Sequence, residues 1–491
     1  MKHAQTTSQQ GNIAGTGLSA SAILESVEAF TKAQLPRLER FWSYYRNPMH
    51  MASDQQSRSR WYRLAQESGL PSRTSGAATD KRIFERREVV VENDIAWRLQ
   101  AMVDFMFGKP IEIRSDAKSP ALARTIERVL HAVWSASGGI ALLQDLALLG
   151  HIYGHADMAL RIQESLIGSG GDDDALSNAA AASLHIELVE PRRGIALLDP
   201  LDYRTIRAYI VRHTHSTKSP AAATGSGLLR HMLTDPQGET LEVIGPRSWT
   251  MFENGRSVWE QTLNLTGGQL PIVHIQNIAQ PFEYSGQGEV EPLIPLQDEL
   301  NTRLSDRASR VTLQSFKMYL AKGIHGFENA RVGPGQIWTT DNPGASVEAF
   351  GGDASSPSEE SHIREVREAL DKISGIPPLA SGVVQAKIGN LSSANALRIT
   401  LMAALSKTAR KRITYGNGIN RMCQLILTAL HNAGVLLTHE HDRRTRLVWQ
   451  DPLPEDTREL MQAAEAKARL GVPKQRILEE LGYGTGEGAR P

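Results

Sequence analysis

The chain has 491 residues, too many for one compact core, so we expect two to four structural regions. Hydrophobic residues make up 41% of it and charged residues 22%, which is typical of a folded globular protein. The 54 Lys and Arg side chains balance the 54 Asp and Glu side chains. A protein that holds a phosphate backbone tightly usually has a basic excess, so any contact with nucleic acid should be weak, local or sliding.

The cysteine content and the start of the chain indicate where the protein is made. The single cysteine, Cys423, lies in an apolar helical run, which predicts no disulfide framework and fits a reducing compartment. The first residues lack the apolar stretch of a signal peptide, and no apolar run approaches the length of a bilayer span. We therefore expect a soluble protein that is made in the cytoplasm and has no membrane partner.

The N-terminal part of the chain contains two segments with helical periodicity. After a flexible polar tail at residues 1–20, the first runs from Ser21 to Asn47-Pro48, and a polar stretch follows to about Lys81. The second, "VVVENDIAWRLQAMVDFMFGKP", ends at a Gly-Lys-Pro stop signal. The apolar positions expected on the buried faces are Ile23, Val27 and Phe30 in the first helix, and Ile95, Leu99, Met102, Val103 and Met106 in the second.

The pattern changes from helix to strand in the middle of the chain. Residues 119–162 predict two more helices, the second being "GIALLQDLALLGHIYGHADMAL", and residues 167–183 predict a Gly/Asp/Ala/Ser linker or insertion. Short β-type runs separated by turns then predict an antiparallel β module over 184–277, with a turn at "ENGR", 253–256. The chain should therefore fold as α+β and mainly helical.

Long helices return in the last 200 or so residues. Residues 288–317 carry one apolar stripe, and Ser356-Pro357 followed by Glu359 predicts the capped start of a second helix, 356–375. Short strand-like pieces rich in Gly and Pro lie between them, at 318–355. A Gly-bracketed loop, 376–391, precedes a long helix, 392–436, in which "YGNG" at 415–418 should favour a bend because glycine is a poor helix former. Two short helices, 455–470 and 473–481, should end the chain.

Residues that could carry catalysis are few. "HIYGHAD" places His151 and His155 one turn apart on a helix, with Asp157 nearby, but the glutamate base of a zinc protease motif is missing. "HEHD" at 439–442 is better explained as a solvated turn, and Asp172–Asp174 as a flexible acidic linker that lacks calcium-loop spacing. No phosphate-binding loop is present. We expect no catalytic residues, no metal and no cofactor, while a metal-dependent nucleic-acid-processing enzyme using His151, His155 and Asp157 remains an alternative.

Several motifs occur in a characteristic order. They are "YYRNP" at 44–48, "ENDIAWRLQAMVDFMFGKP" at 92–110, "GHIYGHADMAL" at 150–160, "LDPLDYRTI" at 198–206, "MFENGR" at 251–256, "SGQGEVEPLIPLQDELN" at 285–301, "SGIPP" with "NLSSANALR" at 374–398, and "WQDPLPEDTRE" at 449–459. In this order the chain resembles the portal proteins of tailed bacteriophages, of the siphophage type and of about this length, over roughly residues 40–480. The resemblance implies a helix-to-strand step at the "YG" of residues 153–154, where periodicity alone predicts a continuous helix.

The resemblance also implies an architecture and a role. It implies a dodecameric ring at one capsid vertex of the virion, through which a terminase packages double-stranded DNA and through which the DNA later leaves. Expected partners are other copies of the chain, the DNA, the terminase large subunit, the major capsid and scaffolding proteins, and a head–tail adaptor. The implied regions are a wing (21–287), a stem (288–317 and 356–375), a clip (318–355), a tunnel loop (376–391) with the long kinked helix (392–436), and a crown (437–491).

Candidate functional residues follow from these regions. Those of the tunnel loop, expected to face DNA or one another, are Val383, Val384, Gln385, Lys387, Ile388 and Asn390. Those of the stem, expected to form ion pairs between subunits because they alternate with acids, are Arg303, Asp306, Arg307 and Arg310. Ile337 and Trp338 could dock a partner at the clip or form a local core. A solvated or intersubunit face is expected for the basic residues of the long helix, which are Lys407, Arg410, Lys411 and Arg412. An oligomeric scaffold without a channel is a further alternative.

Overall fold

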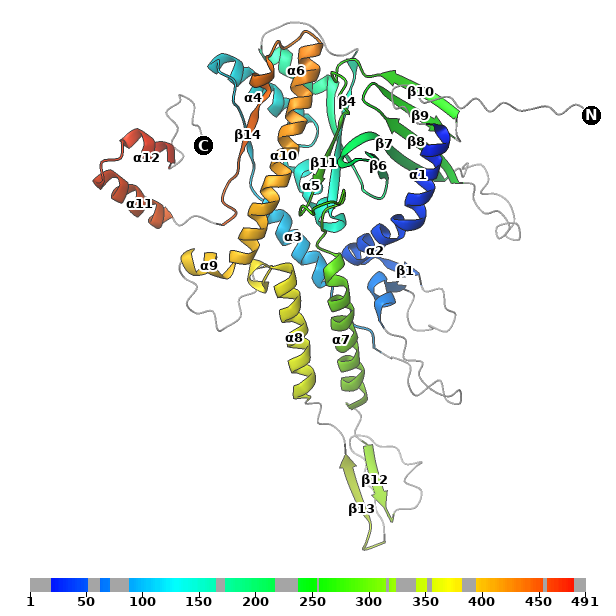
Figure 1. Cartoon of the computed structure of the whole chain (residues 1–491). Coiled ribbons are helices and arrows are strands. Elements are labelled where there is room, and N and C mark those ends of the chain that lie inside the picture. The colour runs from blue at the N-terminus through cyan, green and yellow to red at the C-terminus, as the bar shows by residue number, and fades with distance from the viewer. Residues whose placement is uncertain are drawn as a thin grey trace, which may run out of the picture. The chain divides into compact units, whose positions relative to one another are not determined.

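The computed structural model describes residues 19–51, 62–70, 88–164, 173–216, 237–253, 256–314, 318–323, 341–350, 356–381, 394–453 and 457–480. The chain divides into two compact units. Unit 1 comprises Met1–Phe41, Trp97–Val290 and Gly375–Pro491, and unit 2 comprises Trp42–Ala96 and Glu291–Ser374. The chain therefore leaves unit 1 at residues 290–291 and returns to it at 374–375, and Figure 1 labels the elements of both units.

Helices and antiparallel sheets alternate along unit 1. Its helices are α1 (Ala20–Ala33), α4 (Pro120–Ala136), α5 (Gly139–Tyr153), α6 (Asp173–Ser183), α9 (Ala394–Thr400), α10 (Met402–Asn432), α11 (Thr457–Arg469) and α12 (Lys474–Glu480). Helices α2 (Leu35–Arg46) and α3 (Asp94–Phe107) include the points where the chain passes between the units. The expected buried face of α3 is confirmed, since Ile95, Leu99 and Met106 are all buried.

Three sheets form in unit 1. The largest has five strands in the order β10-β9-β8-β7-β6, and a second has three in the order β11-β4-β5. A two-stranded sheet pairs β14 (Thr445–Val448) with β3 (Glu112–Ser115). The bounds of the other strands are β4 His155–Ile162, β5 Leu184–Val189, β6 Gly194–Asp199, β7 Asp202–Ser216, β8 Gln237–Ile244, β9 Ser248–Glu253, β10 Arg256–Thr262 and β11 Ile272–Gln276. The predicted β module is thus confirmed, although β4 belongs to it as well.

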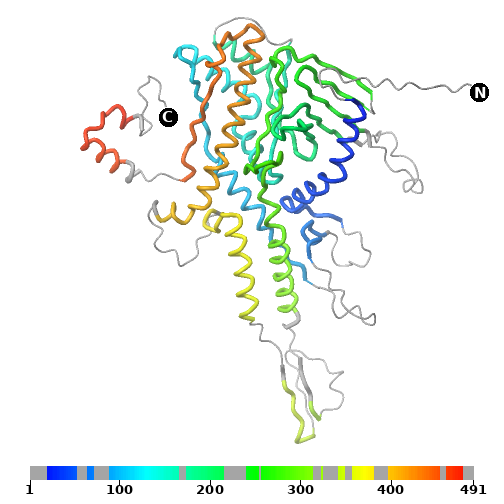
Figure 2. The backbone as a smooth tube through the Cα atoms, viewed as in Figure 1, coloured from blue at the N-terminus to red at the C-terminus, as the bar shows by residue number. Residues whose placement is uncertain are grey.

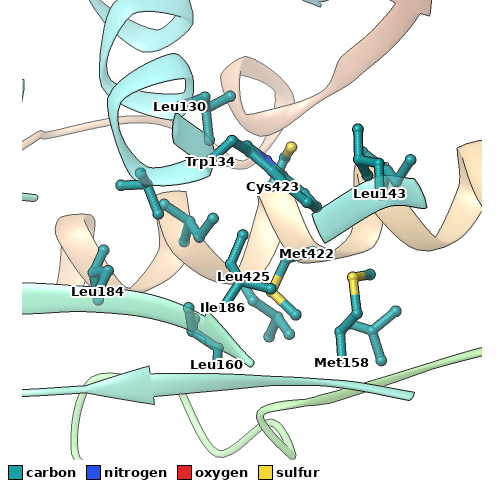
Figure 3. Packing of buried hydrophobic residues seen from close by; sticks show 14 of the residues in the cluster. Leu130, Trp134, Leu143, Met158, Leu160, Leu184, Ile186, Met422, Cys423 and Leu425 are labelled. Atoms are coloured by element: carbon teal, nitrogen blue, oxygen red, sulfur yellow. The ribbon is translucent and has the colours of Figure 1, made fainter. Parts of the chain in front are cut away.

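Helix α10 lies at the centre of the main core of unit 1. Met422, Cys423 and Leu425 of this helix pack among Leu130 and Trp134 of α4 and the side chains of β4 and β5, as Figure 3 shows. Burying apolar area of this kind is the principal stabilising term in folding. No single described helix is long and apolar enough to cross a membrane; α4 and α5 pass such a test only as a pair bent by 67°, and their apolar faces belong to this core.

Unit 2 is built around a pair of helices. Helix α7 (Ile294–Gln314) leads to strand β12 (Met318–Lys322), which pairs antiparallel with β13 (Ser346–Phe350), and α8 (Pro357–Ser374) follows. Figure 2 shows α7 and α8 running side by side. The unit also contains β1 (Met49–Met51), β2 (Tyr62–Leu64) and a short 3-10 helix, Ala65–Gly69. Two predicted long helices with a strand excursion between them are therefore confirmed, and Pro357 is the first residue of α8 as predicted.

Three predictions about local structure were wrong. The helix predicted through residue 162 ends at Gly154, whose φ of 94° favours glycine, and His155 begins a strand. The "YG" step implied by the resemblance is therefore correct. The predicted linker 167–183 contains helix α6, whose Asp173 and Asp174 form ion pairs with Arg128 of α4.

The bend predicted at "YGNG" is also wrong. Helix α10 continues through these residues, and the break in the long helical segment falls at Leu401, between α9 and α10. A Cβ atom on Gly418 would lie 2.3 Å from Ile275 of β11, so this glycine allows close packing between the helix and the sheet.

Candidate functional site

The sequence-predicted site residues fall into two groups. The tunnel-loop residues (Val383, Val384, Gln385, Lys387, Ile388 and Asn390) and the clip residues (Ile337 and Trp338) lie outside the described residues, and their roles stay predictions. The stem residues Arg303, Asp306, Arg307 and Arg310 all lie on α7.

Two of the α7 arginines have partners within their own chain. Arg303 Nε lies 2.7 Å from Glu299 Oε1, and its Nη1 lies 3.6 Å from Asp306 Oδ2. Arg310 pairs with Glu359 of α8 and so links the two helices. Arg307 has no ion pair with any residue that the structure describes. Partly exposed pairs of this kind contribute about 0–1 kcal/mol each, so they align the helices more than they stabilise them.

A polar face of α7 holds the extended segment before α3. Gln297 Oε1 accepts a hydrogen bond from the backbone N–H of Asp94 at 3.0 Å, and Asn301 Oδ1 accepts one from Glu92 at 3.0 Å. Ser305 Oγ accepts another from the N–H of Val90 at 2.9 Å. The three side chains are fully buried. Since buried backbone donors must find acceptors, these residues fix the extended segment on the helix.

This polar face was missed in the sequence. Within the apolar stripe predicted for residues 288–317, Leu293, Leu300 and Leu304 are buried. Val311, the last member of that stripe, is 45% exposed, so the buried part of the stripe ends before it. The signal that could have revealed the polar face is the recurrence of short uncharged polar residues every four positions, at 297, 301 and 305.

A buried ion-pair cluster lies in unit 1, next to the point where the chain leaves it. Glu289 Oε1 lies 2.7 Å from Lys411 Nζ, and Glu289 Oε2 lies 2.7 Å from Lys407 Nζ. The side chains of Glu289, Lys411 and Lys407 are 4%, 2% and 15% exposed. Burial by itself would raise the pKa of the Glu289 carboxyl, but Lys411 and Lys407 outweigh it and hold the pKa at about 2. Glu289 is therefore ionised at neutral pH.

The same region contains a neutral hydrogen-bonded group. Asn277 Oδ1 lies 2.7 Å from His151 Nδ1 and accepts a hydrogen bond from the hydroxyl of Tyr415 at 3.2 Å. Asn277 Nδ2 donates to the carbonyl of Gln287 at 3.0 Å, which makes Oδ1 the acceptor for His151 Nδ1–H. Burial, together with the positive charge of Lys411, lowers the pKa of His151 to about 3, so this imidazole is neutral at neutral pH.

A solvated or intersubunit face was expected for the basic residues of the long helix, but these residues do not share one such face. Lys407 and Lys411 point into the Glu289 cluster, and Arg412 donates to the carbonyl of Gln450 at 2.9 Å, while Arg410 is exposed. The periodicity of basic residues could not show this, because the acid that pairs with them lies 118 positions from Lys407.

The histidines proposed for a metal enzyme have other roles. His151 lies on α5 and His155 on β4, so they do not share a helix face. Asp157 accepts a hydrogen bond from the hydroxyl of Tyr209 at 2.6 Å, and its Oδ1 lies 2.7 Å from His274 Nδ1. Among the described residues, no group of three His, Cys, Asp or Glu side chains could hold a metal ion. The geometry therefore does not support the metal-enzyme alternative.

Comparison with models of known protein families identifies the family of this chain. The family model described as "Phage portal protein, SPP1 Gp6-like" matches residues 25–485. The chain belongs to this family of phage portal proteins. Phage portal proteins are a structural family, and membership supports a role at the portal of the capsid.

Two further comparisons add little to this assignment. A chain of the solved structure titled "Virion of native gene transfer agent (GTA) particle" is 12% identical, with a TM-score of 0.41 over 79% of this chain and 88% of that chain. No match was found among curated protein sequences.

Proposed function

We propose that the chain assembles into a closed ring, dodecameric as expected for a portal, through whose axial channel double-stranded DNA enters and later leaves the capsid. The terminase large subunit would drive packaging from outside, and a head–tail adaptor would dock on the finished ring. The major capsid and scaffolding proteins would surround the ring at its vertex of the virion. Membership of the portal family supports this role.

The observation that carries the proposal is the construction of unit 2. Helices α7 and α8 lie side by side, and the chain between them forms the hairpin β12–β13. These elements correspond to the proposed stem (288–317 and 356–375) and clip (318–355). Each helix carries charged residues outside its apolar stripe, and Arg307 has no partner among the described residues, so it is the arginine that we assign to a contact with a neighbouring subunit.

The remaining regions are assigned by their order in the chain. We assign residues 21–287 to the wing, 437–491 to the crown, and 376–391 to the tunnel loop, from which Lys387 and Gln385 would approach the DNA. The zero net charge supports this assignment, because a channel that bound phosphates strongly would slow sliding DNA.

The proposal is tested by mass photometry of the purified full-length chain, followed by complementation of a portal-deficient phage. A narrow peak near twelve chain masses, and heads that contain nuclease-protected DNA, are expected. Lys387→Ala should lower the amount of packaged DNA, whereas Lys118→Ala, at an exposed lysine before α4, is the matched control. A stable small oligomer that neither forms rings nor complements the phage would instead favour a scaffold without a channel.

A further inference from the structure

The point where the chain leaves unit 1 is held by two other elements of that unit. Besides its contacts with Lys407 and Lys411 of α10, Glu289 donates its backbone N–H to the carbonyl of His151 at the end of α5, at 2.7 Å. The next residue, Val290, is completely buried and is the last residue of unit 1 before the chain enters unit 2. The exit of the chain is therefore fixed to α5 and α10 together.

The point of return is held by the same part of α10. Ile376, the second residue after the return, is 1% exposed and packs with Met102 of α3 and Ala404 of α10. Its carbonyl accepts a hydrogen bond from Arg98 Nη1 of α3 at 2.6 Å. Lys411 Nζ lies 3.7 Å from the sulfur of Met102. Lys411 pairs with Glu289 and Met102 packs with Ile376, so the exit and the return of the chain lie close to each other. Residues 404–411 of α10 thus contact both the exit and the return of the chain.

The helical segment before these residues has a different contact, an ion pair of 2.6 Å between Arg398 of α9 and Asp451. Helix α9 and α10 are separated at Leu401, and Ile399 and Met402 on either side of the break are 72% and 66% exposed. Ala404, two residues further on, is 1% exposed. Burial of α10 therefore begins at the break.

We propose that Glu289 is a positioning residue which, through Lys407 and Lys411, fixes α10 from Ala404 onward to the two chain connections at residues 290–291 and 374–375. The importance of this arrangement rests on the proposed function, since the residues before α9 are those assigned to the tunnel loop.

The chemistry of the cluster explains why an ion pair suits this purpose. Apolar contacts have no preferred direction, so apolar side chains can shift relative to one another at a small cost in free energy. A buried charge is stable only when an opposite charge lies beside it. Removing one partner leaves an uncompensated charge, and removing both leaves a neutral site. The cluster holds two cations for one anion, so losing Glu289 should disturb it more than losing either lysine.

Hydrogen exchange with mass spectrometry on the full-length chain tests the positioning role. In Glu289→Gln, peptides covering 284–290 and 402–412 should exchange at least about tenfold faster, because Lys411 is left buried without a counter-charge. Lys407→Met should change exchange little, because Glu289 still pairs with Lys411 and because Lys407 is the more exposed of the two lysines. Glu289→Gln combined with Lys411→Met should recover most of the protection.

The matched control is another buried glutamate in an ion pair of unit 1. Glu242, 6% exposed, lies 2.9 Å from Arg161, and Glu242→Gln should speed exchange in the β module while leaving 402–412 unchanged. Unchanged exchange at 402–412 in Glu289→Gln, or an equal loss of protection there in both glutamine variants, would overturn the proposal.

Packaging separates this inference from the function on which it rests. Glu289→Gln should still form rings but package less DNA in the portal-deficient phage, and the double variant should recover packaging. Failure of the wild-type chain to form rings would overturn the portal role alone, because the exchange result is independent of it. Normal packaging by Glu289→Gln rings with faster exchange would overturn the link between the Glu289 cluster and packaging.

Discussion

Alanine at the two glycines of α10, Gly416 and Gly418, should have opposite effects on stability. A Cβ atom on Gly418 would lie 2.3 Å from both Cγ1 and Cδ1 of Ile275, so the side chain would have to withdraw by about an ångström. A Cβ atom on Gly416 would meet its nearest neighbours, Leu447 and Trp449, at 3.8 Å, which is ordinary contact.

The magnitudes follow from two terms. Replacing glycine by alanine within a helix gains about 1 kcal/mol, and overpacking a filled core costs about 1–3 kcal/mol. Gly416→Ala should therefore stabilise the protein by about 1 kcal/mol, because it introduces no overlap. Gly418→Ala should destabilise it by about 1–2 kcal/mol, because the overlap outweighs the gain.

Urea unfolding followed by circular dichroism, at one protein concentration for all variants, measures both effects. Ile275→Ala provides the decisive background, because it removes the atoms that an alanine at position 418 would meet. In that background Gly418→Ala should become stabilising. The reasoning is refuted if Gly418→Ala is destabilising to the same extent with and without the Ile275 side chain.

Three further changes test the buried polar contacts. Because burial keeps His151 neutral with a pKa of about 3, the unfolded chain binds a proton that the folded chain does not, and stability should fall by up to about 1.4 kcal/mol per unit as the pH drops from about 6.5 towards 3. His151→Gln should flatten this dependence in pH-dependent urea unfolding, and His185→Gln, at an exposed position, should not. Asn301→Ala should cost about 1–3 kcal/mol and speed exchange of the Glu92 amide, since it removes the acceptor of this part-buried hydrogen bond. Unchanged exchange would contradict the role of the polar face of α7. A double-mutant cycle between Arg310→Met and Glu359→Gln should give a favourable coupling of about 0.5–1 kcal/mol, and a zero coupling would show that the pair does not link α7 to α8.

Elements with a clear periodicity could be predicted from the sequence. The apolar stripe of α3 and the start of α8 at Pro357 were predicted because helix spacing and Ser-Pro are local signals. Strand β4 could not be predicted from its pattern, since it is buried on both faces and lacks alternation. Only the glycine at 154 marks the end of α5.

The polar sites depend on contacts between distant parts of the chain. The Glu289 cluster joins residues more than a hundred positions apart, and a lone glutamate before a helix resembles any solvated acid. Similarly, the glycines of "YGNG" predict a bend when only helix propensity is considered. The helix continues through them instead, because Gly418 packs closely against β11 and tertiary packing overrides helix propensity.

Cryo-electron microscopy of the purified full-length chain tests the portal assignment most directly. We expect closed rings, with about twelvefold symmetry as expected for portals, an axial opening wide enough for B-form DNA, and α7 and α8 of every subunit around that opening. A compact oligomer without an axial opening, or rings in which α7 and α8 lie away from the axis, would contradict the account.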